Sequence, residues 1–98
     1  MGVTLRFDER ALDDLRQIRS YIAERSPSGA ERVRHHIMHT IDSLTDFPFL
    51  GKATDEKRVR ILVVTKYPYL VFYSVVKDEV VILHIRHAAR RPIDPATF

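Results

Sequence analysis

Three apolar runs separated by very short gaps fill most of the second half of the chain. They cover about residues 58–65, 69–76 and 79–87, and each is rich in Val, Ile, Leu and aromatic residues, as strands are. The gap at Lys77-Asp78 has the length of a tight hairpin loop, and the turn around Tyr67-Pro68 is also short. Connections this short join antiparallel neighbours, so we predict a three-stranded antiparallel meander.

The first half of the chain predicts one short strand and two helices. Residues 3–7 alternate apolar with polar side chains, as a half-buried strand does. Asp8 can cap a first helix, which Ser26-Pro27 stops because the residue before a proline avoids the α region. A second helix starts at once, with Ser26 or Ser28 as its cap. Each helix carries an apolar stripe, formed by Ala11, Leu15, Ile18 and Ile22 in the first and by Ala30, Val33, Ile37, Ile41 and Leu44 in the second.

The order of these elements, β-α-α-β-β-β, indicates an α+β fold in one domain that spans residues 1–98. Two amphipathic helices joined by so short a turn should pair as an antiparallel hairpin. We expect this hairpin to cover one face of a four-stranded, mainly antiparallel sheet. Phe47 and Phe49 are expected to anchor the polar loop 52–57 that follows the second helix. The tail that begins at Pro92 cannot extend the sheet.

Composition excludes several classes of protein. The chain has no cysteine, which excludes a disulfide framework and a zinc site built on thiolates. Its most apolar stretches are interrupted by Lys66, Pro68 and Lys77, so we predict neither a transmembrane helix nor a signal peptide. These features lead us to expect a cytoplasmic protein that does not associate with a membrane.

Positive charge is concentrated in the second half of the chain. Residues 1–50 hold seven Lys or Arg and eight Asp or Glu, whereas residues 51–98 hold nine and five. Burying unpaired charges would cost more than a strand gains, so the basic end of the last strand should face water or a partner. A phosphate backbone or an acidic protein segment would fit, and a solvated, Arg-rich sheet face is the alternative. The basic side chains at this end are His84, Arg86, His87, Arg90 and Arg91.

Several features occur in a fixed order along nearly the whole chain. After the β-α-α pattern come Phe47-Pro48 and Gly51-Lys52, then the run Tyr67, Tyr69-Leu70-Val71-Phe72-Tyr73, and last the segment 82–90, ILHIRHAAR. This ordered set resembles the RelE/ParE superfamily of bacterial toxins from type II toxin–antitoxin systems. The resemblance implies the superfamily's fold, with the first strand at the sheet edge beside the second strand.

Two activities occur on this superfamily's fold, so the fold alone does not decide the function. RelE-like members are ribosome-dependent mRNA endonucleases, and ParE-like members inhibit DNA gyrase. Cleaving RNA needs an acid, a base and positive charge on the phosphorane, for which His87 could move protons and Arg60, Arg86 and Arg90 could supply charge. However, the last strand holds no carboxylate after Glu79, no tyrosine follows it, and the ending 88–92 is similar to that of ParE-like chains.

We therefore expect a ParE-like toxin of a plasmid stabilisation, or addiction, module that poisons DNA gyrase and is not an enzyme. No catalytic residue is assigned, and Arg86, His87, Arg90 and Arg91 are expected to bind the target. The alternative is a RelE-like mRNA endonuclease that uses His87, Arg60 and Arg86. A second alternative is a non-toxic, degenerate binding module.

The resemblance also implies partners. A small cognate antitoxin, ParD-like or RelB-like, is expected to form a hetero-oligomer with this chain. We expect the antitoxin to be partly disordered, to fold on binding, and to present acidic and apolar side chains to the outer surface of the helix hairpin and the sheet edge. The other expected partner is DNA gyrase, or the ribosome and mRNA under the alternative.

The remaining histidines are assigned structural roles. His84 is predicted to be a hydrogen-bonded histidine at the sheet edge or against a helix. His35 and His39 have the i, i+4 spacing of a helical metal pair, but no third ligand is in register. We therefore prefer a solvated helix face, and we infer no metal and no organic cofactor.

A few other side chains suit contact with nucleic acid. Tyr67, Tyr69 and Tyr73 could stack on bases, although for Tyr73 a place at the edge of the core is preferred. Lys52 and Lys57 could contact phosphate, and a merely soluble loop explains them equally well.

Overall fold

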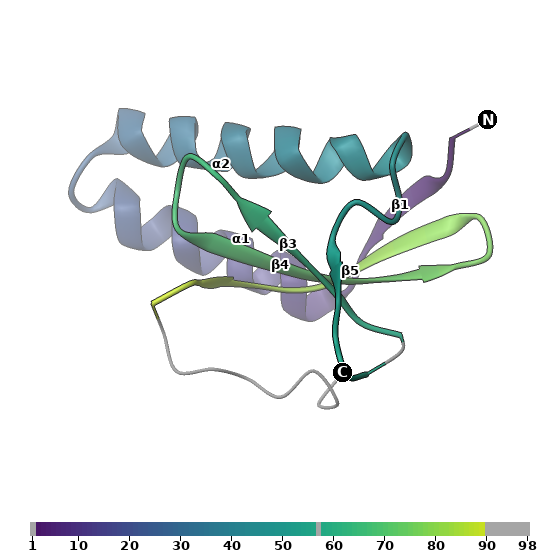
Figure 1. The fold of residues 1–98 in the computed structure, drawn as a ribbon. Coiled ribbons are helices and arrows are strands. Elements are labelled where there is room, and N and C mark those ends of the chain that lie inside the picture. Colours follow the sequence, from purple (N-terminus) through teal and green to yellow (C-terminus); the bar gives the residue numbers. More distant parts are fainter. Residues whose placement is uncertain (1, 57, 90–98) are drawn as a thin grey trace.

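The computed structural model of the protein describes residues 2–56 and 58–89 (Figure 1). The helices are α1 (Glu9–Ala23), α2 (Pro27–Asp42) and the short 3-10 helix η1 (Ser43–Thr45). The strands form one five-stranded sheet in the order β1-β5-β4-β3-β2, in which β1 and β5 are parallel and the other neighbours antiparallel. The α+β fold is as predicted, and β2, at the start of the polar loop, is an additional short strand. The strands are β1 (Thr4–Phe7), β2 (Lys52–Ala53), β3 (Arg60–Val64), β4 (Tyr69–Val76) and β5 (Glu79–His87).

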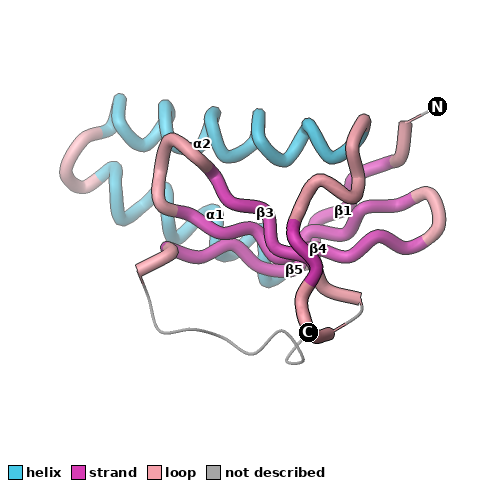
Figure 2. The backbone as a smooth tube through the Cα atoms, viewed as in Figure 1, coloured by secondary structure: helices cyan, strands magenta, loops and turns pink. Residues whose placement is uncertain are grey.

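The helices α1 and α2 form a hairpin on one side of the sheet (Figures 1 and 2). Both begin at polar caps: Glu9 N donates to Asp8 Oδ1 at 3.0 Å, and Gly29 N donates to Ser26 Oγ at 3.1 Å. Of the two serines considered, Ser26 is therefore the cap of α2. Pro27 follows it at the first helical position, where a backbone N–H would have no partner within the helix. Among the described residues, no helix has both the length and the apolar character needed to cross a membrane.

The core lies between the helix hairpin and the sheet. Ile37 and Ile41 of α2 and Leu44 of η1 are fully buried. Burying each such side chain contributes roughly 1.5–3 kcal/mol to stability. In the stripe of α1, Ala11 is fully buried but the other members are only partly buried, so α2 contributes more of the core than α1 does. The sheet residues packed in the same cluster are Leu62, Val64, Tyr69, Val71, Tyr73, Val80, Ile82 and Ile85.

The first strand lies at the sheet edge as expected, but its neighbour is β5 and not β3. The expectation that it lies beside the second strand is therefore wrong. Val80, Val81 and Ile82 of β5 are all buried, which favours a neighbouring strand on each side of this segment. The outer edge of β3 is instead paired with β2. The helix hairpin and the strands after it supply the long connection that a parallel pair requires.

A bulge in β5 reverses the direction of its last side chains. Leu83 has no partner in the pairing with β4, because the pairs on either side are Phe72 with His84 and Tyr73 with Ile82. An extra residue shifts the alternation of side chains by one position. Ile82 and Ile85 therefore both reach the core, although they are three residues apart.

The loop after η1 is held by β3 and β4 and not by its own aromatic side chains. Phe47 and Phe49 are 65% and 64% exposed, so the expectation that they anchor the loop is wrong. Instead, Gly51 N donates to Tyr73 Oη at 2.7 Å. Arg60 Nη1 donates to Gly51 O at 2.7 Å and to Phe49 O at 3.3 Å. Polar contacts from the sheet to the loop backbone replace the apolar anchor.

Tyr73 is fully buried in the core and not at its edge. Burial raises the pKa of Tyr73, and the Gly51 N–H and the positive charge of Arg60 oppose the shift only in part. The hydroxyl therefore stays protonated at neutral pH. A Cβ on Gly51 would lie 2.6 Å from Tyr73 Oη and 2.9 Å from Ile61 O, so this close approach requires a glycine.

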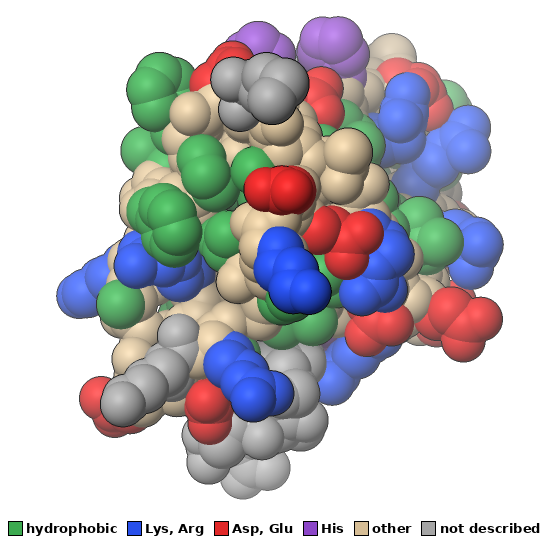
Figure 3. Space-filling view, turned by 90° about the vertical axis from the view of Figure 1, so that its right-hand side faces the viewer, with side chains coloured by type: hydrophobic (Ala, Val, Ile, Leu, Met, Phe, Trp, Pro, Cys, Tyr) green, Lys and Arg blue, Asp and Glu red, His purple; other side chains and the backbone are tan. Residues whose placement is uncertain are grey.

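The face that carries the β4–β5 turn mixes charges of both signs (Figure 3). Exposed hydrophobic side chains gather on one part of it, and acidic and basic groups are intermixed on the rest. Arg6 Nε and Glu79 Oε1, which lie 3.1 Å apart, form an ion pair between β1 and β5. This end of the molecule presents no field of a single sign.

We expect Tyr73→Phe to lower the free energy of unfolding by about 1–3 kcal/mol, because the buried Gly51 N–H would lose its partner. Urea denaturation followed by circular dichroism checks this. Tyr21→Phe removes the same hydroxyl from a side chain that is 58% exposed, and it should change stability by less than about 0.5 kcal/mol. Equal effects of the two substitutions would contradict the role assigned to Tyr73.

Candidate functional site

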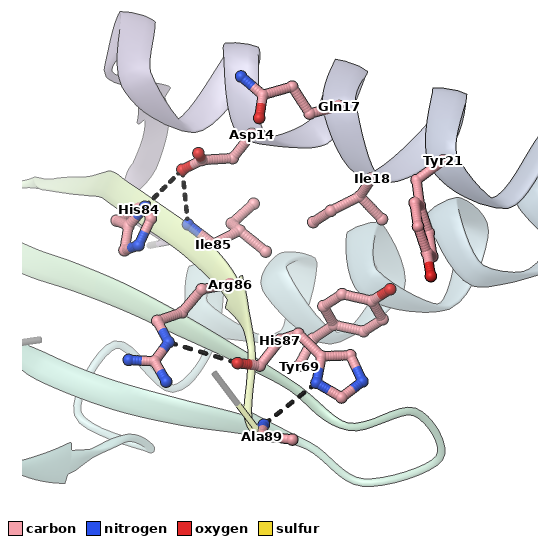
Figure 4. Close-up of a pocket in the computed structure, with 10 residues that line it drawn as sticks. All are labelled: Asp14, Gln17, Ile18, Tyr21, Tyr69, His84, Ile85, Arg86, His87 and Ala89. Atoms are coloured by element: carbon pink, nitrogen blue, oxygen red, sulfur yellow. Dashed lines mark hydrogen bonds and ion pairs between the residues drawn. The ribbon is translucent and has the colours of Figure 1, made fainter. Parts of the chain in front are cut away.

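The end of β5 meets α1 and the first residue of β4, and these segments enclose a cavity of about 650 Å³ (Figure 4). Two of the predicted target-binding residues, Arg86 and His87, line it. The complete lining is Asp14, Gln17, Ile18, Tyr21, Tyr69, His84, Ile85, Arg86, His87 and Ala89.

A carboxylate from α1 closes the part of the β5 edge that lacks a neighbouring strand. The contact of β1 with β5 ends where Asp8 N donates to Ile82 O at 2.9 Å. Beyond that point, Ile85 N donates to Asp14 Oδ2 at 3.0 Å, and the same oxygen lies 2.6 Å from His84 Nδ1. Asp14 therefore pairs with a backbone N–H that a further strand would otherwise bond.

His84 is a hydrogen-bonded histidine between the sheet edge and a helix, as predicted. Its burial lowers the pKa of His84, the hydrogen bond and charge of Asp14 oppose the shift, and the charges of Arg10 and Arg86 add to it. The imidazole is therefore neutral at pH 7. In that state we assign its proton to Nδ1, which donates to Asp14.

His87 lies on the helix-facing side of β5, opposite Tyr69, because of the bulge. The two rings meet edge to face, with centroids 5.4 Å apart. Ala89 N donates to His87 Nδ1 at 3.1 Å, which assigns the proton of the neutral ring to Nε2. Ala88 N also donates to Pro68 O at 2.6 Å and ties the strand end to the β3–β4 turn. Nε2 is thus the ring nitrogen of His87 that remains for contact with a ligand.

Arg86 and His87 point to opposite sides of the strand, as neighbours in a strand do (Figure 4). Arg86 pairs with Leu70 on the face away from the helices and is 8% exposed. Its Nε donates to His87 O at 3.3 Å. The structure therefore divides the predicted basic cluster between two faces. Arg90 and Arg91, the other two predicted members, lie outside the described residues.

Arg60, the third residue of the nuclease alternative, is not brought to this cavity. It pairs with Tyr73, whereas His87 pairs with Tyr69, four residues further along β4. At about 3.3 Å per residue this separates them by roughly 13 Å along the strand. The Arg60 guanidinium lies over the Phe49 ring, 5.0 Å from its centroid, and holds the loop backbone.

The residues considered as metal ligands or phosphate contacts do not form a common site among the described residues. His35 and His39 are exposed on α2, as expected of a solvated helix face, and Lys52 is exposed in β2. Lys57 lies outside the described residues. Within residues 2–56 and 58–89, no group of three or more His, Asp or Glu side chains could hold a metal ion.

Asp14 is the residue of this site that the sequence analysis does not identify. It follows Ala11 by three residues and precedes Ile18 by four, so it lies on the apolar stripe of α1 and not on its polar face. An acidic side chain within a stripe that faces the core is the signal that could have revealed it, because such a group needs hydrogen-bond partners.

A family model and the sequences of known proteins both relate this chain to toxins. The family model described as "ParE toxin of type II toxin-antitoxin system, parDE" matches residues 5–92. The chain is 40% identical to Toxin RelE2 of Caulobacter vibrioides over 81 residues. This alignment covers 83% of the present chain and 90% of Toxin RelE2. The chain is 36% identical over 84 residues to Putative toxin Y4kP of Sinorhizobium fredii, covering 86% of each.

Solved structures share the fold. A structure described as the chromosomal ParDE TA system from P. aeruginosa aligns with a TM-score of 0.77 at 22% identity, covering 88% of this chain and 96% of that one. The isolated E. coli RelE toxin aligns with a TM-score of 0.70 at 21% identity, covering 92% and 88%. At these identities the likeness establishes the fold.

We expect Asp14→Ala to lower the free energy of unfolding by about 2–3 kcal/mol, because Ile85 N–H and His84 would both lose a charged acceptor. Urea denaturation measures the loss. Asp13→Ala is the matched control, since Asp13 forms an exposed ion pair of 3.8 Å with Arg16 and accepts an exposed hydrogen bond from Gln17 Nε2. Its cost should stay below about 1 kcal/mol, and a cost equal to that of Asp14→Ala would refute the edge-closing role.

Stability should also depend on pH through His84. The pKa of His84 in the folded protein lies below the value of 6.5 for the unfolded chain, so the unfolded state binds more protons in that range. The contribution of the neutral imidazole is fully present above about pH 6.5 and is lost as the pH falls through the lower folded value. Urea unfolding between pH 8 and 5 should show a larger decline for the wild type than for His84→Asn, whose amide can still donate to Asp14. Parallel curves would contradict this.

Proposed function

The chain belongs to the ParE toxin family of type II toxin–antitoxin systems, within the RelE/ParE superfamily, and on that premise we propose that it stops bacterial growth by inhibiting DNA gyrase. In this proposal the end of β5 binds the target, and a cognate antitoxin keeps the toxin inactive. The observation that carries the choice of gyrase is the position of Arg60, which is engaged by the loop after η1.

An RNA-cleaving site needs proton-transfer groups and positive charge around one phosphate. The cavity at the end of β5 is lined by two imidazoles, and Arg86, the one cationic residue of its described lining, points its side chain to the opposite face of the sheet. Its one carboxylate, among the described lining residues, is Asp14, which already accepts from Ile85 N and His84. With Arg60 about 13 Å away along the strand, these groups support binding better than catalysis.

The second candidate is a ribosome-dependent mRNA endonuclease. It is favoured by the name of Toxin RelE2, and by the Asp14–His84 pair beside the cavity that His87 also lines. A neutral imidazole held by a carboxylate is a common general base. Under this candidate Nε2 of His84 would accept the proton of the attacking hydroxyl, His87 would donate a proton from its Nε2 to the leaving oxygen, and Arg86 would supply charge.

The proposed antitoxin is an acidic and apolar chain seated on the outer surface of the helix hairpin and on the β5 edge. Tyr21 and Leu12 of α1 are 58% and 39% exposed, which offers apolar contact on this surface. The formal net charge of this chain is +3, so an acidic partner has a favourable long-range attraction. Such a complex would be a hetero-oligomer.

We expect the purified protein to inhibit supercoiling by purified gyrase and to leave mRNA uncut on translating ribosomes. Arg90→Ala combined with Arg91→Ala should reduce the inhibition roughly tenfold without changing the melting temperature, because the target-binding end would carry two fewer charges. The matched control, Arg16→Ala combined with Lys77→Ala, removes two cations from other surfaces and should inhibit like the parent.

Three outcomes would overturn parts of this proposal. Ribosome-dependent cleavage that disappears in His87→Ala, with gyrase unaffected, would make the protein an mRNA endonuclease. Inactivity in both assays, together with harmless expression in cells, would make it a non-toxic binding module. A double variant at Arg90 and Arg91 that inhibits like its control would show that these arginines do not bind the target.

A further inference from the structure

A second hollow lies on the other side of the β3–β4 turn from the cavity at the end of β5. It is formed by the first half of α2 and by the turn itself, has a volume of about 430 Å³, and shares no lining residue with the first cavity. Its lining includes Arg32, Arg34 and His36 of α2 and Lys66 and Tyr67 of the turn. Tyr69, two residues after Tyr67, lines the first cavity, so both hollows border one turn.

The second hollow carries an excess of positive charge. Glu31 is the carboxylate in its lining, and that group is already bound by Arg19 at 3.1 Å and by Arg34 at 3.5 Å. Within the part of the chain that the structure describes, neither Arg32 nor Lys66 forms an ion pair. Two cations beside a compensated carboxylate produce a local field that attracts anions.

An aromatic ring stands next to one of these cations. Lys66 Nζ lies 5.7 Å from the centroid of the Tyr67 ring. The same ring meets His36 edge to face, with centroids 5.5 Å apart. Proteins that bind single-stranded nucleic acid combine a positively charged groove for the backbone with aromatic rings on which bases stack. An acidic peptide would use the cations but would gain little from the ring.

His36, one of the lining residues, has a ring nitrogen that forms no hydrogen bond among the described residues. His36 Nε2 is buried and has no hydrogen-bond partner among the described residues, a situation that costs about 1–3 kcal/mol. The packing of His36 against Tyr67 can therefore rearrange without breaking a hydrogen bond at Nε2. After such a rearrangement, a polar group of a ligand could satisfy His36 Nε2.

We propose that this hollow is a nucleic-acid contact in which Arg32 and Lys66 bind the phosphates of a single strand and Tyr67 stacks on a base. Because the turn also borders the cavity at the end of β5, a strand bound there continues past Tyr67 and Tyr69 towards His87. The proposal is independent of gyrase inhibition, since binding to nucleic acid is measured without gyrase.

The test uses fluorescence anisotropy of a labelled oligothymidylate of about 12 nucleotides, a length within the usual range of single-strand sites. Lys66→Glu should weaken binding roughly tenfold and make the salt dependence shallower by about 0.7 for each phosphate that the protein no longer neutralises. Lys77→Glu is the matched control, because Lys77 is an exposed lysine of the other hairpin turn, between β4 and β5. It should bind like the parent.

Two substitutions at Tyr67 test base stacking. Tyr67→Phe keeps the aromatic ring and should bind the oligonucleotide like the parent. Tyr67→Leu removes the ring and should weaken binding. Equal losses for Lys66→Glu and Lys77→Glu would overturn the proposal, because net charge alone would explain them. Equal binding of duplex DNA, with no effect of Tyr67→Leu, would also overturn it. Polyglutamate that competes as well as the oligonucleotide would assign the hollow to an acidic protein segment instead.

Discussion

One carboxylate, Asp14, holds the part of β5 that has no strand on its outer side. β1 supports β5 only as far as Ile82, and the bulge at Leu83 interrupts the pairing with β4 at the same place. The next residues would form an exposed edge if Asp14 did not accept from Ile85 N and His84. The end of β5, with His87 and the cavity it lines, is thus held by Asp14 on its outer side and by β4 on its inner side.

The bulge sets which face of the sheet each basic side chain at the end of β5 points to. Without the extra residue at Leu83, Ile85 would point away from the core and His84 into it. With it, His87 faces the cavity and Arg86 the opposite side of the sheet. An anionic partner that contacts both residues must therefore pass around the edge of β5, which is the edge that Asp14 closes. The extra residue, Leu83, therefore sets the directions of both side chains.

Local patterns in the sequence predict the elements, and contacts between distant residues decide the rest. The spacing of apolar residues predicts α1, α2 and the strands of the meander, because in each element the apolar residues recur on the face that is buried. The partner of β1 and the bond from Asp14 to Ile85 join residues about 70 positions apart, so no local signal announces them. Phe47 and Phe49 show the converse case, in which a local pattern gives a wrong prediction. Their apolar side chains suggest that they anchor the loop, but hydrogen bonds of Tyr73 and Arg60 with the loop backbone hold it in place.

Arg60 and the end of β5 lie apart in the sheet and make separate contacts. Arg60 makes hydrogen bonds to Gly51 O and Phe49 O and lies over the Phe49 ring. Hydrogen bonds from a charged donor contribute about 1.5–3 kcal/mol each, so moving this guanidinium to a phosphate would release the loop at a comparable cost. A phosphate near His87, roughly 13 Å along the strand, would have to repay that cost before it gained any charge stabilisation. Arg60 therefore acts as a support of the sheet and its loop, and it contributes no charge to the surroundings of His87.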